Sequence, residues 1–196
     1  MAVKRISITE FVSMMEQYPI LDVRSPLEYA HAHMKNAYSL PLFSDEERKV
    51  VGTAYKQQGK QPAIKLGLNY FGVKMAAMVS EVEALLAASP DPNNKVVLVH
   101  CWRGGMRSAG VAWLLDLYGY TVYTLAGGYK AYRNWVLAQF MLPYQCKVLG
   151  GFTGSGKTET LESLKALGQP IIDLEGLAHH KGSTFGNLGQ PVQPSQ

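Results

Sequence analysis

Cysteine is scarce in this sequence, with only Cys101 and Cys146 among 196 residues. Two cysteines are too few for a disulfide framework, which excludes the class of small disulfide-stapled secreted proteins. No stretch of 18 uninterrupted apolar residues occurs, so we expect no membrane-spanning helix. The opening residues MAVKRISITEF lack the apolar core of a signal peptide, and we therefore expect a cytoplasmic protein whose cysteines stay reduced.

Metal ligands in a usable pattern are also missing, because His, Cys and carboxylate residues nowhere recur at zinc spacing. We therefore expect no metal centre. The sequence does contain 47% hydrophobic residues, enough for a packed core, and a formal net charge of +4. This mild positive charge permits a phosphate or RNA partner without requiring one.

Short apolar runs alternate with helical patterns along the first 140 residues. Ser44 with Glu47 three residues later forms a capping-box start to one helix, and Ser25 followed by Pro26 starts another. The alternation predicts an α/β domain with a mostly parallel sheet. The expected strands lie at 20–23, 37–42, 96–100 and from 121, and the expected helices at 26–33, 45–59, 63–88, 108–118 and 129–140.

A change of pattern near residue 140 predicts two domains. We expect a first domain at 1–140, a linker at 141–145 and a second α/β unit at 146–196, which opens with an apolar strand at Cys146–Gly151. Only 47 residues run from Gly150 to Gln196, fewer than a P-loop domain needs. We expect the second domain to be incomplete.

The stretch HCWRGGMRS, from His100 to Ser108, places a cysteine where a predicted strand ends and a helix begins. At the carboxyl end of a parallel strand, loop amides and a helix N-terminus form a cradle for anions, and they lower the pKa of a thiol. Arg103 and Arg107 would neutralise an incoming oxyanion, which makes Cys101 a candidate nucleophile. The remaining members of the predicted cradle are Trp102, Gly104, Gly105, Met106 and Ser108.

A second reading of Cys101 is a small buried apolar residue, a role that free cysteines often have. The two flanking arginines favour the reactive reading, because a structural cysteine has no use for them. Cys146, at the start of a predicted strand, is interpreted as structural.

The stretch GFTGSGKT, from Gly151 to Thr158, is a complete G-x4-G-K-T phosphate loop between a predicted strand and a helix. Its loop amides would cradle phosphate groups, Lys157 would reach the terminal ones, and Thr158 could bind Mg²⁺. The predicted phosphate-binding residues are Gly151, Gly154, Ser155, Gly156, Lys157 and Thr158. A nucleoside triphosphate, a pyrophosphate and a phosphorylated lipid all remain open as its ligand. Asp173 is read equally as a metal-side acid or as a cap.

Three stretches of the first domain resemble rhodanese-type sulfurtransferases: LDVRSPLEYAHAHMKNAYSLPL, the cysteine loop and LAGGYKAYR. The resemblance implies that Cys101 carries sulfur as a persulfide, with Asp22 and Arg24 as an ion-paired framework behind the site. The Cys-x5-Arg spacing is one residue longer than the usual sulfurtransferase loop and matches the pattern of cysteine phosphatases. We therefore hypothesise that the cradle accepts a phosphorylated chalcogen donor or a comparable oxyanion.

The whole chain is similar to the family of tRNA 2-selenouridine synthases, through VHCWRGGMRSAGVAWLL, GGYKAYR, GGFTGSGKTETL and DLEGLAHHKGSTFG. That resemblance implies replacement of sulfur by selenium in wobble 2-thiouridine of tRNA, with selenophosphate as donor. It also implies geranyl diphosphate as a second substrate, which makes the sulfur a leaving group. No tightly bound cofactor is implied. Cys101 matches the essential cysteine of the family, and we expect full turnover to need residues beyond Gln196.

A tRNA partner would need a basic surface with aromatic side chains, and a solvated face is the alternative reading of the same residues. The candidates are Lys56, Lys60, Lys65, Lys74, Lys130 and Arg133, with Tyr55, Tyr70, Tyr129 and Tyr132. Three other functions remain open: a plain sulfurtransferase, a cysteine-dependent phosphatase and a regulatory ATP-binding module. The first two would not need Lys157, and the third would not need Cys101.

Overall fold

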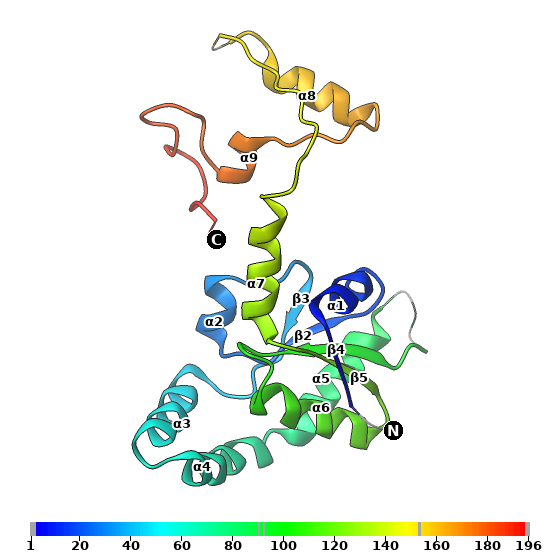
Figure 1. The fold of residues 1–196 in the computed structure, drawn as a ribbon, viewed down its shortest axis with the longest axis vertical. Helices are drawn as coiled ribbons and strands as arrows, with labels where there is room; N and C mark the ends of the chain where they lie inside the picture. The colour runs from blue at the N-terminus through cyan, green and yellow to red at the C-terminus, as the bar shows by residue number, and fades with distance from the viewer. Residues whose placement is uncertain (1–2, 90, 92, 153, 195–196) are drawn as a thin grey trace. The chain divides into compact units, whose positions relative to one another are not determined.

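The computed structural model describes residues 3–89, 91, 93–152 and 154–194. The chain divides into two compact units, Met1–Leu142 and Pro143–Gln196. The first unit contains a five-stranded sheet in the order β1-β5-β4-β2-β3, and all of its strand pairs are parallel (Figure 1). This confirms the predicted α/β fold with a parallel sheet. The strands are β1 (Lys4–Ile6), β2 (Ile20–Asp22), β3 (Ala37–Ser39), β4 (Val96–His100) and β5 (Thr121–Leu125).

The described part of the first unit also contains seven helices, of which α1, α5, α6 and α7 cover the two faces of the sheet. Successive residues of β4 point to opposite faces, so Val97 and Val99 pack in one apolar cluster while Leu98 packs in another. The first cluster is closed by α5 and α6, and the second by α1 and α7. The helices are α1 (Ile8–Met14), α2 (Pro26–His31), α3 (Asp45–Gln57), α4 (Lys60–Gly72), α5 (Met75–Ala87), α6 (Met106–Tyr118) and α7 (Gly128–Gln139).

Side-chain caps fix where several helices begin. The predicted capping box of Ser44 and Glu47 is present at the start of α3, and Ser7 with Glu10 forms an equivalent one before α1. The helical pattern predicted at 63–88 is divided into α4 and α5 by a turn at Val73 and Lys74. Strand β1 and helix α1 were not among the predicted elements.

The second unit contains α8 (Lys157–Ala166) and α9 (Leu174–Ala178). The strand predicted at Cys146–Gly151 is absent, so this prediction was wrong. A strand is stable only when a neighbouring strand pairs with it, and the described residues from 143 to 194 form no strand. Val148 is accordingly 92% exposed in spite of its apolar side chain.

No helix among the described residues is long and apolar enough to cross a membrane.

Helix α6 offers a matched test of the first core cluster. Leu115 is fully buried and Leu117, two residues later on the same helix, is 69% exposed. We expect Leu115→Ala to lower the free energy of unfolding by about 2–5 kcal/mol, because it leaves a cavity in the core. Leu117→Ala should change it by less than about 0.5 kcal/mol. Urea denaturation measures both values, and equal losses would contradict the packing described here.

Candidate active site

Cys101 follows β4, the middle strand of the sheet, and the loop after it leads directly into α6. The flanking strands β2 and β5 end at the same edge, so their loops surround the cysteine. The thiol is 3% exposed. The predicted strand-loop-helix setting of Cys101 is therefore present in the structure.

Hydrogen-bond donors from the start of α6 surround the sulfur. Cys101 Sγ lies 3.3 Å from Ser108 Oγ, and the Gly105 amide donates to it over 3.4 Å. Burial raises the pKa of the thiol, but hydrogen bonds from Ser108 and Gly105 lower it. The positive charge of Arg107 lowers it further, and the net result is a pKa below the ordinary value of cysteine. The loop therefore favours the thiolate, the form that acts as a nucleophile.

Arg107 is held by a carboxylate that sequence spacing did not reveal. Its guanidinium donates to both oxygens of Glu28, over 2.6 and 3.3 Å, from a position 79 residues away. Arg48 lies 3.6 Å from the same carboxylate. Burial raises the pKa of Glu28, but Arg107, the Ser25 amide and Arg48 lower it to a net value below that of free glutamate. Glu28 therefore stays ionised and fixes the Arg107 guanidinium beside the cysteine loop.

The other predicted cradle residues lie in the same loop with different exposures. Trp102 is half-buried and packs against the Tyr129 ring, with 5.8 Å between the centroids. The Arg103 side chain is exposed, and Met106 is half exposed at the first turn of α6. Their predicted contact with an incoming oxyanion remains a prediction.

Two glycine-containing loops touch backbone to backbone beneath the cysteine. A Cβ on Gly104 would lie 2.3 Å from the Leu125 carbonyl oxygen, and one on Gly128 would lie 2.3 Å from the Cys101 carbonyl oxygen. Both glycines have positive φ, which residues with a side chain rarely adopt. The Tyr129 amide donates to the Cys101 carbonyl over 2.8 Å, so the start of α7 fixes the shape of the cysteine loop.

A buried ion pair lies at the end of β2, next to the cysteine strand. Arg24 donates to both carboxylate oxygens of Asp22 and to the Ala32 carbonyl, and its guanidinium lies 3.9 Å from the centre of the Tyr129 ring. Both members of the pair are at most 1% exposed. The structure thus shows that Asp22 and Arg24 form an ion pair, and their role as a framework behind the site stays a prediction.

His100 completes the buried polar group as an uncharged ring. Its Nε2 lies 3.7 Å from the Asp22 carboxylate, but burial lowers the pKa of the imidazole to about 4. The nearby charges of Asp22 and Arg24 act in opposite directions on it. Among the described residues, neither ring nitrogen has a hydrogen-bond partner.

The phosphate loop of the second unit is bent around its own lysine. Lys157 Nζ donates to the carbonyls of Gly151 and Phe152 over 3.0 and 2.8 Å, and Gly154 and Gly156 have positive φ. Ser155 precedes α8 and Thr158 lies in its first turn, while Thr153 of the motif lies outside the described residues. Phosphate binding by this loop remains a prediction.

Asp173, which the sequence allowed to be either a metal-side acid or a cap, caps a helix in the structure. Its carboxylate accepts a hydrogen bond from the Gly176 amide at the start of α9 over 3.0 Å. This is the ordinary role of an aspartate at an N-cap.

Comparison with known proteins relates each unit to a described family. The model of the rhodanese-like domain matches residues 7–134, and that of the tRNA 2-selenouridine synthase AAA domain matches residues 144–196. Among solved structures, the N-terminal domain of a putative ATP/GTP binding protein from Clostridium difficile 630 is 40% identical. It superposes with a TM-score of 0.61, over 69% of this chain and 99% of that one.

Proteins named tRNA 2-selenouridine synthase are similar to both units. The one from Bdellovibrio bacteriovorus is 39% identical over 202 residues, which cover 100% of this chain and 51% of that protein. The one from Sulfurovum sp. is 42% identical over 179 residues, which cover 88% of this chain and 46% of that protein. The chain spans about half the length of the curated relatives it matches.

The hydrogen bond from Ser108 gives a direct test of the thiol. In a Cys146→Ser background, the pH dependence of iodoacetamide labelling reports Cys101 alone. We expect a labelling midpoint below that of free cysteine. Ser108→Ala should move the midpoint upward, because the thiolate loses a donor. Comparing midpoints removes the effect of burial on the absolute rate. A midpoint that Ser108→Ala leaves unchanged would contradict this description of the site.

Glu28→Gln should move the same midpoint in the opposite direction. The substitution keeps the cap of α2, since glutamine also serves in a capping box, but it removes the charge that balances Arg107. The positive charge then acts more strongly on the sulfur, and the pKa of Cys101 should fall. A rise would contradict this prediction, because it would mean that Arg107 leaves the sulfur once the charge of Glu28 is removed.

Proposed function

Because the chain belongs to the rhodanese-like domain family and its second unit matches the tRNA 2-selenouridine synthase AAA domain, we propose that it works in selenium transfer to tRNA. The reaction replaces the sulfur of wobble 2-thiouridine by selenium. A single observation carries the proposal: a thiol of lowered pKa in a rhodanese-like unit shares its chain with a phosphate loop. Both features suit anionic ligands, and the reagents of this reaction are phosphorylated.

The cysteine loop is proposed to take selenophosphate. Selenophosphate is a tetrahedral anion, and the start of α6 offers it backbone amides together with the Arg107 guanidinium. The Cys-x5-Arg loop is one residue longer than the loop of ordinary sulfurtransferases, which suits a ligand larger than a bare sulfur atom. Cys101 would meet the selenium of the donor at the sheet edge.

The proposed chemistry runs in three steps that balance without a redox partner. In the first, the thiocarbonyl sulfur of the tRNA attacks the first carbon of geranyl diphosphate, and the carbon–oxygen bond to the diphosphate breaks. In the second, selenium from selenophosphate adds to the C2 carbon of the base and geranylthiol departs. Water then takes the phosphoryl group as inorganic phosphate. Geranylation matters because it converts a poor leaving group into a thiol.

The phosphate loop is proposed to hold a phosphorylated group through Lys157. The ammonium now contacts two carbonyl oxygens of its own loop, and it would exchange these for phosphate oxygens. Thr158, in the first turn of α8, is the residue type that binds Mg²⁺ in such loops. Gly154 and Gly156 have positive φ, which lets the loop backbone turn tightly enough to surround a phosphate group.

A tRNA partner is supported by part of the basic surface named from the sequence. Lys56, Lys60 and Lys65 are exposed on α3 and α4, where Tyr55 is also half exposed. Tyr129 is buried against Arg24 and Tyr70 packs on the core, so neither supplies a free stacking surface. Lys74 is paired with Glu47. The lysines of α3 and α4 are therefore the stronger candidates for phosphate contacts.

Two alternatives predict different uses of the same residues. A plain sulfurtransferase would form a persulfide on Cys101 and would not need Lys157. A cysteine-dependent phosphatase would release phosphate from an aryl phosphate, again without Lys157. Selenium transfer needs both residues.

Mass spectrometry of tRNA from cells that lack the native enzyme tests the proposal. The cells receive this chain, or this chain continued by the remaining half of the Bdellovibrio relative, each with and without Cys101→Ala and Lys157→Ala. We expect the fusion to restore 2-selenouridine and each substitution to abolish it. Selenouridine that persists with Cys101→Ala would overturn the proposal. Selenouridine that persists with Lys157→Ala would show that selenium transfer does not need the phosphate loop.

A further inference from the structure

An apolar groove of about 730 Å³ lies beside the cysteine loop in the first unit. Its walls come from α3, α4 and the start of α6, and Phe43 and Phe71 are among the residues that line it. This volume falls in the usual range for small-molecule sites in proteins, roughly 300–1,000 Å³. All the residues that line it belong to the first unit, whereas the phosphate loop belongs to the second.

Large apolar side chains line this groove although they face solvent. Leu68 is 57% exposed, Trp113 is 53% exposed, and Tyr55 and Met106 are each about half exposed. Scattered single apolar residues need no explanation, but a hollow that gathers several of them marks a binding surface. The lining therefore favours a ligand with an apolar body.

The charged residues of the same groove all have one sign. Arg48, Lys49, Lys56 and Arg107 line it, and no Asp or Glu does so among the described residues. Arg48 and Arg107 share the single carboxylate of Glu28, so one positive charge stays uncompensated where the groove meets the cysteine loop. An anionic head group is the complement of this end, and an apolar chain is the complement of the rest.

One end of the groove lies at the candidate active site, and this indicates how a ligand would be oriented in it. Met106 and Arg107 line the groove and begin α6, directly after the loop that carries Cys101. A ligand whose head lay against the Arg48 and Arg107 guanidiniums would therefore extend its apolar chain away from the sulfur, between α3, α4 and α6.

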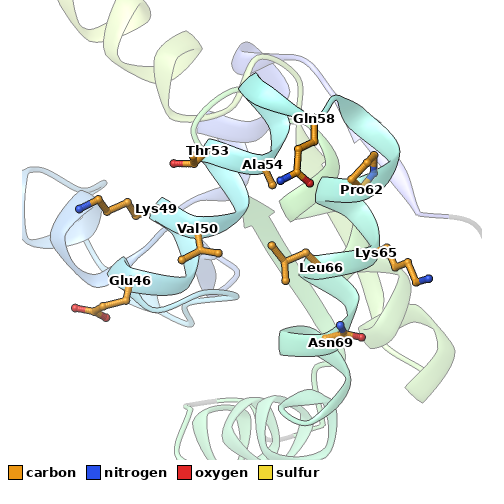
Figure 2. A pocket seen from close by; sticks show the side chains of 10 residues that line it. All are labelled: Glu46, Lys49, Val50, Thr53, Ala54, Gln58, Pro62, Lys65, Leu66 and Asn69. Atoms are coloured by element: carbon orange, nitrogen blue, oxygen red, sulfur yellow. The ribbon is translucent and has the colours of Figure 1, made fainter.

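A second hollow, between α3 and α4 alone, lacks these properties. Figure 2 shows Val50 and Leu66 pointing into the space between the two helices, while Glu46, Lys49 and Lys65 extend outwards. It has no aromatic side chain in its lining, it includes an acidic residue, and it does not reach the cysteine loop. The groove beside the loop is the stronger candidate.

We propose that this groove binds the isoprenoid chain of a prenyl diphosphate, with the diphosphate against Arg48 and Arg107. The inference rests on the proposed function, in which geranyl diphosphate is a substrate, and it adds where that substrate lies. The prenyl reagent is held by the rhodanese-like unit, so the phosphate loop is not its principal site. The diphosphate end of the bound reagent, which carries the reacting first carbon, thereby lies next to the cysteine loop at which selenium is delivered.

Calorimetric titration of the 196-residue chain with geranyl diphosphate, dimethylallyl diphosphate and inorganic diphosphate tests the location. Each methylene that enters an apolar site strengthens binding by about fourfold, so geranyl diphosphate should bind at least about tenfold tighter than dimethylallyl diphosphate. Leu68→Glu should weaken geranyl diphosphate by about tenfold or more, because it puts a charge into the groove, and should change inorganic diphosphate less.

Leu117→Glu is the matched control, since Leu117 is an exposed helical leucine outside the groove. It should leave all three affinities within about twofold, as surface substitutions usually do. Thermal melting checks that both variants fold. Lys157→Ala should preserve the preference for the longer chain.

Two results would overturn the inference. Equal binding of the three ligands would mean that the groove does not hold the prenyl chain. Loss of the chain-length preference with Lys157→Ala, but not with Leu68→Glu, would place the prenyl chain in the second unit. Either result leaves the proposed function intact, because tRNA mass spectrometry tests that separately. Conversely, groove binding without any selenouridine formation would contradict the proposed function and keep the inference.

Discussion

A single guanidinium, that of Arg24, joins three parts of the first unit in a place that water does not reach. It pairs with Asp22 at the end of β2, reaches the Ala32 carbonyl just after α2, and stacks over the Tyr129 ring at the start of α7. Burying a charge is costly unless every donor is satisfied, and this arrangement satisfies several at once. The loops on either side of Cys101 are therefore held in place by contacts with the same buried guanidinium.

The pKa of the Cys101 thiol depends on burial and on the polar and charged groups that lie around it. Burial alone would keep Cys101 protonated, yet the donors of Ser108 and Gly105 and the charge of Arg107 outweigh it. Glu28 in turn limits what Arg107 can contribute, since it holds the guanidinium in a bidentate pair. The state of the sulfur is thus set by a balance among four groups from two separate segments of the chain.

Local signals in the sequence were sufficient for much of this picture. Alternating strands and helices predicted the parallel sheet, and the capping residue Ser44 and the strand before Cys101 were correctly located. The Ser7 and Glu10 pair before α1 carried the same capping signal as Ser44 and Glu47, so α1 was recoverable from the sequence. The ion pair between Glu28 and Arg107 could not be predicted, because folding brings the two residues together and no local sequence pattern indicates that contact. At residues 146–151 the apolar run suggested a strand, but strand formation depends on a partner that local sequence does not specify.

The pairing of the first strand with the last has a consequence for how the polypeptide acquires this shape during synthesis. Strand β1 at Lys4–Ile6 hydrogen-bonds only to β5 at Thr121–Leu125 in the strand order, so its edge of the sheet stays open until more than a hundred further residues have been translated. Until then β1 has no strand to pair with, and Phe11 of α1 lacks Leu125 and Tyr129 of its apolar cluster. The ribosome must therefore release nearly the entire unit before its outer strand can close, and a nascent chain halted earlier would present that segment to chaperones.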